Sequence, residues 1–545
     1  MEHRQNLSAL TFQGLLRNSK SRYSQNKALG FDEEKLMTYA EMHEAIEETQ
    51  KKLAGLGLSP GDKLALLSNN SPNWAIAYFA ATSMGAIVVP MLPDLQKHEI
   101  LNILTHSEAR FLLVSEKLEK KFDDEVNALP ETIIMLDDMS ILKGDANAQP
   151  VEPDIPEIAE DDLAVIIYTS GTTGNSKGVK LTHKNLIVNA IQGDGVQPVN
   201  QDDRFLSVLP LSHAYENTLG LLLPVLNGAS VTYIRKPPTA SVLMPAMKRV
   251  KPTLMLTVPM IIEKVVRKKV FSKFESGGLI TLMYRLAPFR RLVHYLAGKK
   301  IKTAFGGELK FFGIGGAKLD ARVERFLIDA KFPYAIGYGL TETAPLSAGC
   351  APFKTKLQST GPAVRGADIR ISDGRDGGAI GEVLIKGPNV MKGYYKNPVL
   401  TNEVFTDDGY FRSGDLGIFD RKGRLYLRGR TKNMILGANG ENIYPEDIES
   451  VINNYSYVTE SVVVERKGKL VALVHFNREE IEEKFQNMRH DIHERVEEKL
   501  EVLRKDLQDF VNSRVNRYSR LQMVVVQPDE FEKTATHKIK RFMYE

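Results

Sequence analysis

From about residue 10 to residue 430, short apolar runs alternate with segments whose apolar positions recur at helical spacing. The clearest apolar runs are KLALLS (63–68), AIVVPML (86–92), ARFLLVS (109–115), LAVIIYTS (163–170), RFLSVLP (204–210), ASVTYI (229–234) and LMLTVP (254–259). A continuous apolar run is typical of a strand buried on both faces, and its alternation with helices indicates parallel sheets. The pattern therefore predicts an α/β fold with stacked lobes.

The pattern changes near residue 360, where short strands and frequent glycines predict a small antiparallel or barrel-like lobe at about 350–430. Beyond it, strands near 461–476 and a charged segment of helical periodicity at 478–517 form a shorter unit. We expect that segment to be a solvated surface helix, with a coiled-coil partner as the weaker alternative. The predicted domains are a large N-terminal domain, 1–430, and a small mobile α+β domain, 431–545.

The longest uncharged stretch, Ser68–Pro93, approaches the length that spans a membrane. Small and polar residues interrupt it, and Gly85 precedes the apolar run Ala86–Pro90. We therefore expect a buried helix, a turn and a short buried strand rather than a membrane span. The first residues, MEHRQNLSALTFQGLL, have neither the apolar segment nor the cleavage site of a secretory signal, so we expect a cytoplasmic protein.

Composition narrows the classes of function. The 545 residues include 72 Lys+Arg and 68 Asp+Glu, so the formal charge of +4 does not by itself indicate nucleic-acid binding. With 43% hydrophobic residues, the chain has enough apolar content for several cores. The one cysteine, Cys350, excludes an intrachain disulfide and an all-cysteine metal site, and it favours a reducing compartment.

At residues 166–178, IIYTSGTTGNSKG, an apolar run opens into hydroxyls, glycines and one lysine. Glycines let backbone N–H groups approach phosphate oxygens, hydroxyls donate directional hydrogen bonds, and a lysine supplies a cation. The spacing differs from the standard P-loop, which excludes a kinase built on it, while an ordinary turn remains open. The candidate phosphate-binding residues are Thr169, Ser170, Gly171, Thr172, Thr173, Gly174 and Lys177.

The stretch YTSGTTGNSKGV (168–179) closely resembles the signature loop of the adenylate-forming superfamily, which includes acyl-CoA synthetases, firefly luciferases and peptide-synthetase adenylation domains. The resemblance spans nearly the whole chain. It implies an enzyme that activates a carboxylic acid with ATP to an acyl-adenylate, releases pyrophosphate and passes the acyl group to a thiol. Further motifs in the family's order are LPLSH (209–213), GGA (315–317), GYGLTE (337–342), SGD (413–415), GR (429–430) and KTATHKIKR (533–541).

The resemblance also implies contacts with the nucleotide and its metal. Glu342 would hold Mg²⁺, a hard cation suited to carboxylate and phosphate oxygens, and Thr341 would donate to the α-phosphate. Adenine would stack on Tyr338 and meet the backbone of the GGA motif, while Asp415 and Arg430 would bind the ribose. The implied nucleotide-binding residues outside the phosphate loop are Gly315, Gly316, Ala317, Tyr338, Gly339, Thr341, Asp415 and Arg430.

Near the end of the chain, the resemblance implies that Lys538 is catalytic in the adenylation step, together with Thr341 and Glu342. A lysine can contact both the substrate carboxylate and a phosphoryl oxygen, which in a water-excluded site is worth roughly 10²–10³ in rate. The resemblance also puts a hinge at Lys432. A loop with the sequence of an ordinary turn, containing Gly437, Asn439 and Gly440, would then face CoA.

Within the superfamily, LPLSHAYENTLG (209–220) and FGGELKFFGIGGAKLD (305–320) look most like long-chain fatty acyl-CoA synthetases. The implied partners are a long-chain fatty acid, ATP and CoA, with Mg²⁺ as cofactor. Segments 213–223 and 254–266 are apolar enough to line an alkyl tunnel or to be ordinary core, and His213 is interpreted as a tunnel-lining residue rather than a base. The alternatives are an acyl-AMP ligase that delivers to a carrier protein and a non-catalytic acyl- or nucleotide-binding homologue.

Residues 264–302 combine basic and apolar positions. Eleven basic residues and one acidic residue, Glu275, give a local excess of ten in a chain whose total is +4. The interspersed apolar side chains predict a patch for peripheral contact with anionic lipid membranes. A solvated basic face and a homodimer contact remain open, and no nucleic-acid-binding module accompanies the charge.

Overall fold

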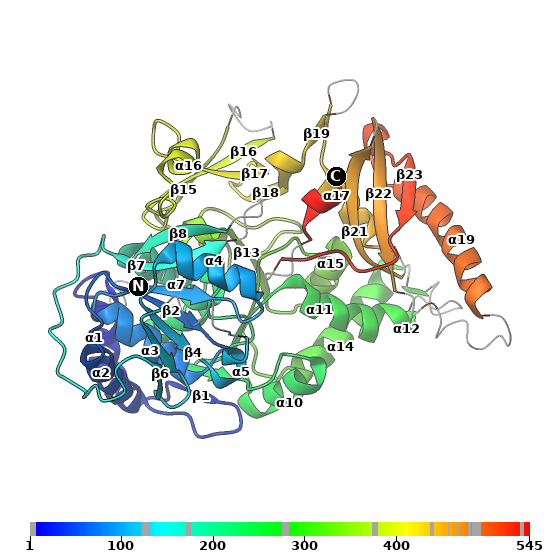
Figure 1. The fold of residues 1–545 in the computed structure, drawn as a ribbon. Helices are drawn as coiled ribbons and strands as arrows, with labels where there is room; N and C mark the ends of the chain where they lie inside the picture. The colour runs from blue at the N-terminus through cyan, green and yellow to red at the C-terminus, as the bar shows by residue number, and fades with distance from the viewer. Residues whose placement is uncertain are drawn as a thin grey trace. The chain divides into compact units, whose positions relative to one another are not determined.

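The chain divides into two compact units in the computed structural model (Figure 1). The first unit comprises Met1–Ile369, Ile385–Arg412 and Gly423–Leu425, and the second comprises Arg370–Leu384, Ser413–Lys422 and Tyr426–Glu545. The predicted domain boundary at 430/431 stays a prediction. The structure describes residues 7–121, 130–169, 176–274, 283–284, 286–372, 380–436, 441–455, 457–466, 468–477, 481, 492–534 and 539–545.

One seven-stranded sheet of the first unit has the order β6-β5-β4-β2-β3-β7-β8. Its inner strands run parallel, and the two edge strands β6 and β8 run antiparallel to their neighbours. Both faces of the inner strands are buried, which explains their continuous apolar sequences. The bounds are β2 Lys63–Leu67, β3 Ile87–Met91, β4 Phe111–Val114, β5 Thr132–Met135, β6 Ile141–Lys143, β7 Leu163–Thr169 and β8 Lys177–Thr182.

The other seven-stranded sheet of this unit has the order β1-β10-β9-β11-β12-β13-β14. The first six strands in that order run parallel, and β14 runs antiparallel to β13. In such sheets ligands bind beyond the carboxyl ends of the parallel strands. The bounds are β1 Leu29–Phe31, β9 Arg204–Leu206, β10 Ser230–Tyr233, β11 Leu254–Thr257, β12 Phe311–Ile314, β13 Tyr334–Gly339 and β14 Leu346–Gly349.

Three helices of the first unit, α2, α3 and α7, begin at residues whose side chains cap the helix by hydrogen bonding. Thr38 and Thr182 form capping boxes at the starts of α2 and α7, and Ser71 accepts from the backbone N–H of Trp74 at the start of α3. The bounds are α1 Phe12–Tyr23, α2 Tyr39–Gly55, α3 Pro72–Ser83, α4 Lys97–Ser107, α5 Glu116–Glu119, α7 His183–Val196, α8 Ala214–Glu216, α9 Leu223–Asn227, α10 Ala240–Val250, α11 Pro259–Val266, α12 Ser272–Phe274, α14 Ala287–Ala304, α15 Ala321–Asp329 and α16 Pro398–Glu403.

The uncharged stretch at 68–93 forms α3 and β3, with Gly85 between them at φ 82°. Every residue of α3 except Asn73 is buried, because this helix lies inside the largest apolar core. A helix that is apolar all round is expected there. The prediction of a buried helix, turn and strand is therefore confirmed. None of the helices in the described part of the chain has both the length and the apolar character that a membrane crossing needs.

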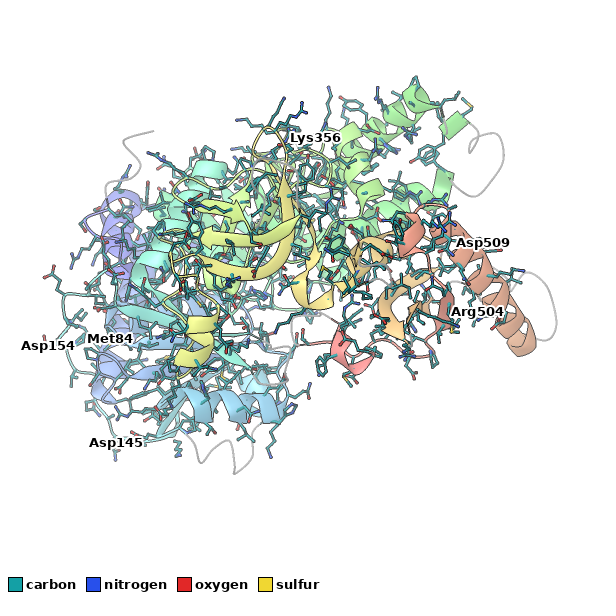
Figure 2. All side chains as sticks on the ribbon, turned by 90° about the horizontal axis from the view of Figure 1, so that it is seen from above. Met84, Asp145, Asp154, Lys356, Arg504 and Asp509 are labelled. Carbon is teal, nitrogen blue, oxygen red and sulfur yellow. The ribbon has the colours of Figure 1, made fainter. Side chains whose placement is uncertain are left out.

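The second unit contains most of a four-stranded sheet, β15-β16-β17-β18, and a three-stranded sheet, β21-β22-β23, packed with α17 and α19. Strands β21 and β22 form an antiparallel hairpin, and β23 runs parallel to β22. Arg504 and Asp509 mark α19 in Figure 2. The bounds are β15 Asp368–Ile371, β16 Gly381–Lys386, β17 Phe411–Phe419, β18 Leu425–Arg430, β19 Ile435–Leu436, β20 Asn442–Ile443, β21 Val458–Arg466, β22 Lys469–Phe476, β23 Met523–Val526, α17 Pro445–Ile452 and α19 Ile492–Asn512.

The seven apolar runs that predicted buried strands form β2, β3, β4, β7, β9, β10 and β11. They belong to sheets made mainly of parallel strands and covered by helices, so the predicted α/β fold class is confirmed. The charged segment at 478–517 contains α19, which is a helix as expected.

Candidate active site

The GYGLTE motif ends β13 and forms a tight turn before β14. The turn therefore lies at the carboxyl end of the parallel strands, where sheets of this kind bind ligands. A Cβ atom on Gly339 would lie 1.6 Å from the backbone oxygen of Pro345, so only glycine fits at that position. Thr341 is buried and Glu342 is half-buried in the turn.

Buried amides hold this turn in place. The Asn189 side chain on α7 donates to the Leu346 carbonyl at 2.7 Å and accepts from the Leu346 N–H at 2.9 Å. The Asn389 side chain donates to the Thr343 carbonyl at 2.8 Å. Sequence reasoning missed both asparagines, because an asparagine inside an apolar segment does not reveal its partner. The turn is thus fixed by neutral hydrogen bonds.

Tyr394 joins Glu342 to Lys177. Its hydroxyl donates to Glu342 Oε1 at 2.9 Å, and Lys177 Nζ lies 5.4 Å from the centre of its ring. A cation at this distance from an aromatic ring is attracted to it. The backbone N–H of Met391 also donates to the Glu342 carbonyl at 2.8 Å. The structure therefore brings together the predicted metal residue and the predicted phosphate-loop lysine, and Tyr394 is a residue that the sequence interpretation missed.

Strands β7 and β8 form the base of the predicted phosphate loop. Thr169, the last residue of β7, pairs with Lys177, the first residue of β8. The ring of His106 lies beside this base and hydrogen-bonds to the Tyr168 hydroxyl at 2.7 Å. The other predicted residues of the loop, Ser170, Gly171, Thr172, Thr173 and Gly174, lie outside the described residues.

The GGA motif follows β12 directly. The backbone N–H of Gly315 donates to the Thr257 carbonyl at 3.0 Å, and Gly316 has φ 83°, a conformation that favours glycine. A Cβ atom on Gly315 would lie 3.1 Å from the Tyr215 ring. These glycines bring backbone close to a neighbouring ring at the end of β12. Ala317 completes the motif, and the ring of Tyr338, predicted to stack on adenine, is buried on the adjacent strand β13.

Asp415 and Arg430 form an ion pair in the second unit. Arg430 Nε lies 2.7 Å from Asp415 Oδ1, and the Asp415 backbone N–H donates to Ser413 Oγ at 3.0 Å. Asp415 is buried on β17, whereas Arg430 ends β18 with a more exposed side chain. The predicted ribose-binding pair is thus one local cluster. The predicted hinge residue, Lys432, is exposed in the 3₁₀ turn Thr431–Asn433 that follows.

The segment after β23 is anchored on both sides of residues 535–538. Lys533 Nζ lies 2.8 Å from Glu460 Oε1, and the backbone of Lys533 bridges that of Ile539. Arg541 forms an ion pair with Glu449 at 2.5 Å. The predicted catalytic Lys538 and the predicted CoA-facing Gly437, Asn439 and Gly440 lie outside the described residues.

A small apolar cavity of about 40 Å³ lies beside the GYGLTE turn in the first unit. Tyr215 lines it on one side, and Ile336 and Gly337 of β13 line it on another. His213, predicted to line the tunnel, caps the N-terminus of α8 two residues before Tyr215 and is not among the described residues that line this cavity. The remaining lining residues are Gly193, Val196, Gln197, Phe205, Leu219, Leu223, Leu254, Leu256, Phe311, Gly313, Ala335, Leu346, Gly349 and Cys350.

A buried carboxyl group, Glu216, follows Tyr215. Burial raises the pKa of Glu216 to about 8, and a hydrogen bond with Ser207 opposes that rise. The carboxyl group is therefore mostly protonated at pH 7, so no negative charge stands beside the cavity at this position. Burial likewise raises the pKa of the Tyr215 hydroxyl.

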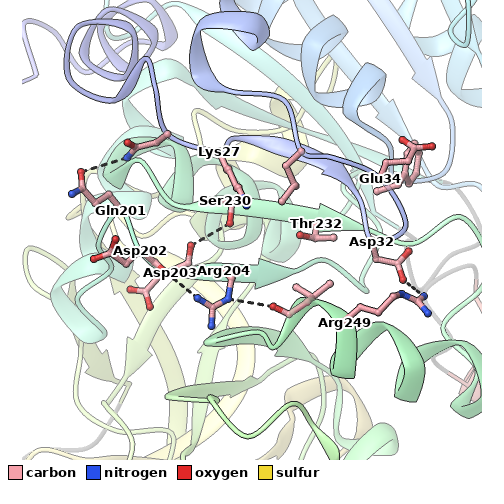
Figure 3. A pocket seen from close by; sticks show the side chains of 14 residues that line it. Lys27, Asp32, Glu34, Gln201, Asp202, Asp203, Arg204, Ser230, Thr232 and Arg249 are labelled. Atoms are coloured by element: carbon pink, nitrogen blue, oxygen red, sulfur yellow. Dashed lines mark hydrogen bonds and ion pairs between the residues drawn. The ribbon is translucent and has the colours of Figure 1, made fainter.

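A larger pocket of about 530 Å³ opens elsewhere on the first unit (Figure 3). Its walls are polar, and their charges are largely paired: Arg249 with Asp32, and Arg204 with Glu308 and the Lys251 carbonyl. None of the residues predicted for the site lines it. The size of a pocket therefore does not identify the site in this chain.

Comparison with known proteins agrees with the motifs. A family model described as AMP-binding enzyme matches residues 16–395. The long-chain-fatty-acid–CoA ligase FadD15 of Mycobacterium bovis is 29% identical over 485 residues, which cover 82% of this chain and 78% of the relative. The 4-coumarate–CoA ligase 2 of Nicotiana tabacum is 29% identical over 455 residues, covering 80% and 78%.

Solved structures share the fold. The O-succinylbenzoate coenzyme A synthetase of Bacillus subtilis in complex with AMP is 24% identical, with a TM-score of 0.77 and 97% of each chain covered. The anthranilate CoA ligase AuaEII in complex with anthranoyl-AMP is 21% identical, with a TM-score of 0.79, covering 98% of this chain and 96% of that one. The chain belongs to the AMP-binding enzyme family, in the adenylate-forming superfamily that its motifs resemble.

Proposed function

We propose that the chain is an ATP- and Mg²⁺-dependent long-chain fatty acid–CoA ligase. Membership of the AMP-binding family makes it an adenylate-forming enzyme, and the named relatives support a CoA ligase for an acyl or aryl acid. The products would be acyl-CoA, AMP and pyrophosphate.

The observation that carries this proposal is the position of β13 between two different environments. Ile336 and Gly337 border the apolar cavity, and Glu342, a few residues later, lies beside Tyr394 and Lys177. An apolar space next to a charged turn suits a molecule with a hydrophobic body and a carboxylate head. A fatty acid has both parts.

The donor set around Glu342 fits Mg²⁺ that arrives with ATP. Mg²⁺ is usually held by one or two carboxylates together with phosphate oxygens and water. In the described part of the chain, no group of three or more His, Cys, Asp or Glu side chains is arranged to hold a metal. A neutral hydroxyl donor, Tyr394, leaves the Glu342 charge available to a cation. The ion would neutralise phosphate charge during attack by the carboxylate.

The remaining nucleotide contacts are proposed from the motifs and their positions. Thr341 would donate to the α-phosphate, and Thr169 and Lys177 would contact the other phosphates with the loop between them. Tyr338 and the GGA glycines would bind adenine, and the Asp415–Arg430 pair would bind the ribose. Each contact replaces solvent around a charged nucleotide with fixed donors and acceptors.

Lys538 is proposed as the catalytic cation that contacts the substrate carboxylate in adenylation. Lys538→Ala is expected to lower the rate of acyl-AMP formation by roughly 10²–10³. Transfer of an added acyl-AMP to CoA should continue, because that step does not need this cation. ATP–pyrophosphate exchange and acyl-CoA formation measure the two steps separately, with Lys540→Ala as the control. An unchanged exchange rate in Lys538→Ala would contradict the role.

For the second step, residues 431–545 are proposed to act as a mobile domain hinged at Lys432. Gly437, Asn439 and Gly440 would face the pantetheine of CoA. Adenylation and thiol transfer place different demands on one site, and a short hinge between domains is a common solution.

An aryl acid is the second candidate substrate. The cavity of about 40 Å³ is far smaller than a typical ligand pocket, roughly 300–1,000 Å³. A long alkyl chain therefore requires lining side chains, such as Leu219 or Leu223, to move. Leu219 lies in the irregular π-helix Asn217–Leu222, and such segments are frequent at functional sites. The 4-coumarate ligases among the relatives favour the aryl alternative.

The test is pyrophosphate release from ATP with straight-chain acids of increasing length and with 4-coumarate, each with and without CoA. We expect turnover that requires CoA and is highest with long chains. Highest turnover with 4-coumarate would replace the fatty acid by an aryl acid. Acyl-AMP that accumulates without consuming CoA would indicate a carrier-protein acceptor, and no pyrophosphate with any acid would indicate a non-catalytic binding protein.

A further inference from the structure

The basic segment at 264–302 separates into an inner and an outer part. Phe271 and Val270 are buried in an apolar core, so the start of the segment packs inside the first unit. Helix α14 instead exposes large apolar side chains: Leu292 is 55% exposed, Tyr295 46% and Leu296 51%. The exposed apolar part of the segment is therefore one face of α14.

Tight packing fixes which face of α14 points inward. The His294 ring is buried and hydrogen-bonds to Asp329 on α15 at 2.9 Å. A Cβ atom on Gly298 would lie 2.5 Å from the Ala330 side chain, so the helix approaches its neighbour closely at that point. Ile301 continues the buried line one turn later. Leu292 and Leu296 lie on the other side of the helix.

Basic side chains lie next to the exposed apolar side chains of α14. Lys299 and Lys300 are exposed one turn after Leu296. Arg291 points toward α15, where its Nε lies 4.0 Å from Asp329 Oδ1. Leu286, 63% exposed, caps the start of the helix. The whole of α14, Ala287–Ala304, contains no acidic residue. An apolar line of side chains flanked by cations matches the headgroup region of a bilayer that contains anionic lipid.

We propose that the outer face of α14, formed by Leu286, Leu292, Tyr295, Leu296, Lys299 and Lys300, docks on an anionic lipid membrane. The apolar side chains enter the boundary between headgroups and acyl chains, and the lysines contact lipid phosphates. The contact is peripheral, since no helix in the described residues is long and apolar enough to cross a bilayer. Its use, the collection of a membrane-dissolved fatty acid, rests on the proposed function.

The test is flotation of the full-length protein with two kinds of vesicle: phosphatidylcholine alone, and phosphatidylcholine mixed with phosphatidylglycerol. We expect binding only to the anionic vesicles, and we expect it to weaken strongly between about 0.1 M and about 0.5 M salt because ions screen the lysines. Equal binding to both vesicle types, or no binding to either, would overturn the proposal.

Two variants test the two parts of the face. Leu292→Asp with Leu296→Asp should lower vesicle binding by about tenfold or more, because it removes the apolar insertion. Lys299→Glu with Lys300→Glu should lower binding to anionic vesicles by about thirtyfold. The controls are Leu142→Asp, at an exposed leucine elsewhere, and Lys35→Glu with Lys117→Glu, at two exposed lysines elsewhere. Variants that bind like the parent would overturn the proposal.

Two further measurements separate this proposal from its rivals. Light scattering reports whether the face joins two copies of the chain: a dimer that Leu292→Asp with Leu296→Asp dissociates would assign the face to self-association instead. Pyrophosphate release with dissolved acids should be unchanged in all these variants. Loss of vesicle binding with turnover retained identifies the docking face, whereas vesicle binding without turnover on any acid would refute the proposed function alone.

Discussion

Two glutamates, the buried Glu216 in the first unit and the largely buried Glu449 in the second, have different partners. Burial raises the pKa of Glu216 to about 8, and its Oε2 has no hydrogen-bond partner among the described residues. Glu449 instead lies 2.5 Å from Arg541 and accepts from the Val463 N–H at 2.7 Å. Desolvation raises the pKa of Glu449, and the Arg541 guanidinium opposes that rise.

The difference extends beyond these two residues. Around the apolar cavity and the Glu342 turn, the buried polar contacts are neutral: the Asn189 and Asn389 amides and the protonated Glu216. In the second unit, Lys533 and Arg541 anchor the segments that flank Lys538 through ion pairs. In the proposed function, neutral surroundings would suit a hydrophobic acid, and these ion pairs would hold the segments on either side of the proposed catalytic Lys538. We therefore expect replacement of a glutamate by glutamine to change the free energy of unfolding in opposite directions at Glu449 and at Glu216.

Removing the charge of Glu449 should have the largest effect on stability. Glu449→Gln leaves the partly buried Arg541 without its counter-ion, and breaking a buried pair in this way costs up to about 3–5 kcal/mol. Urea unfolding followed by circular dichroism measures the loss. Glu449→Leu combined with Arg541→Leu is the control, because it removes both charges and should restore much of the stability. A single variant as stable as the parent would contradict the ion-pair account.

Glu216→Gln should instead raise the free energy of unfolding. The ordinary pKa of a glutamate is 4.5, so between pH 4.5 and about 8 the folded chain holds a proton that the unfolded chain has lost. Stability therefore falls as the pH rises through this window. Glu216→Gln removes the slope and should be more stable than the parent at pH 7 by up to about 3 kcal/mol.

Urea unfolding at several pH values between 4.5 and 8 measures this slope. Glu48→Gln, at an exposed position on α2, is the control and should leave the slope unchanged. If the stability of Glu216→Gln depended on pH as that of the parent does, Glu216 would not be buried and protonated at pH 7.

Tyr394→Phe tests the hydrogen bond from a neutral donor at the candidate active site and should have a smaller effect. It removes the hydroxyl that donates to Glu342 but keeps the ring beside Lys177. A hydrogen bond to a charged group is worth about 1.5–3 kcal/mol, so the Mg²⁺ concentration for half-maximal rate should shift by about tenfold. Without the Tyr394 hydroxyl, the Glu342 carboxylate is held less firmly in position. We therefore expect the Mg²⁺ concentration for half-maximal rate to rise.

Two comparisons distinguish positioning from general damage. Tyr395→Phe, at the adjacent tyrosine, should leave the Mg²⁺ dependence unchanged, and the melting temperature of Tyr394→Phe should stay close to that of the parent. A parental Mg²⁺ dependence in Tyr394→Phe would remove Tyr394 from the site.

The sequence predicted the strands well because their apolar runs are continuous. The family motifs also predict that Glu342 and Lys177 act in one site; the structure places both beside Tyr394, and their roles stay predictions. The sequence did not reveal Tyr394: the sequence GYYKN contains two adjacent tyrosines, and only the register that bridges Val179 to Tyr394 decides which one reaches Glu342. Register depends on contacts between distant segments, which local patterns do not contain.

Burial was equally hard to predict. Glu216 follows Tyr215 in a segment whose polar residues resemble those of a surface turn, yet it is only 2% exposed. In the basic segment, Phe271 and Leu292 are both apolar, but one packs in a core and the other is exposed on α14. His213 is predicted to line a tunnel, and Tyr215, two residues later, lines the apolar cavity. Which of these side chains are buried depends on which face each helix packs against its neighbours.

The central claim is that the apolar cavity beside the Glu342 turn binds the acid. Gly349 lines the cavity, and a Cβ atom added to it would meet Leu346 and Val196 at ordinary contact distances of 3.6 and 3.8 Å. Gly349→Val therefore narrows the cavity, and its Cβ atom does not clash with these neighbours. Gly195→Val is the control, because a Cβ atom at Gly195 has no neighbour within 4 Å.

The most direct measurement is kcat/KM for the preferred acid and KM for ATP in Gly349→Val. Each methylene excluded from an apolar site costs about 0.8 kcal/mol, so exclusion of two lowers kcat/KM for the acid by about tenfold. KM for ATP should be unchanged, and Gly195→Val should match the parent. An unchanged kcat/KM for every acid in Gly349→Val would contradict the assignment of this cavity to the substrate.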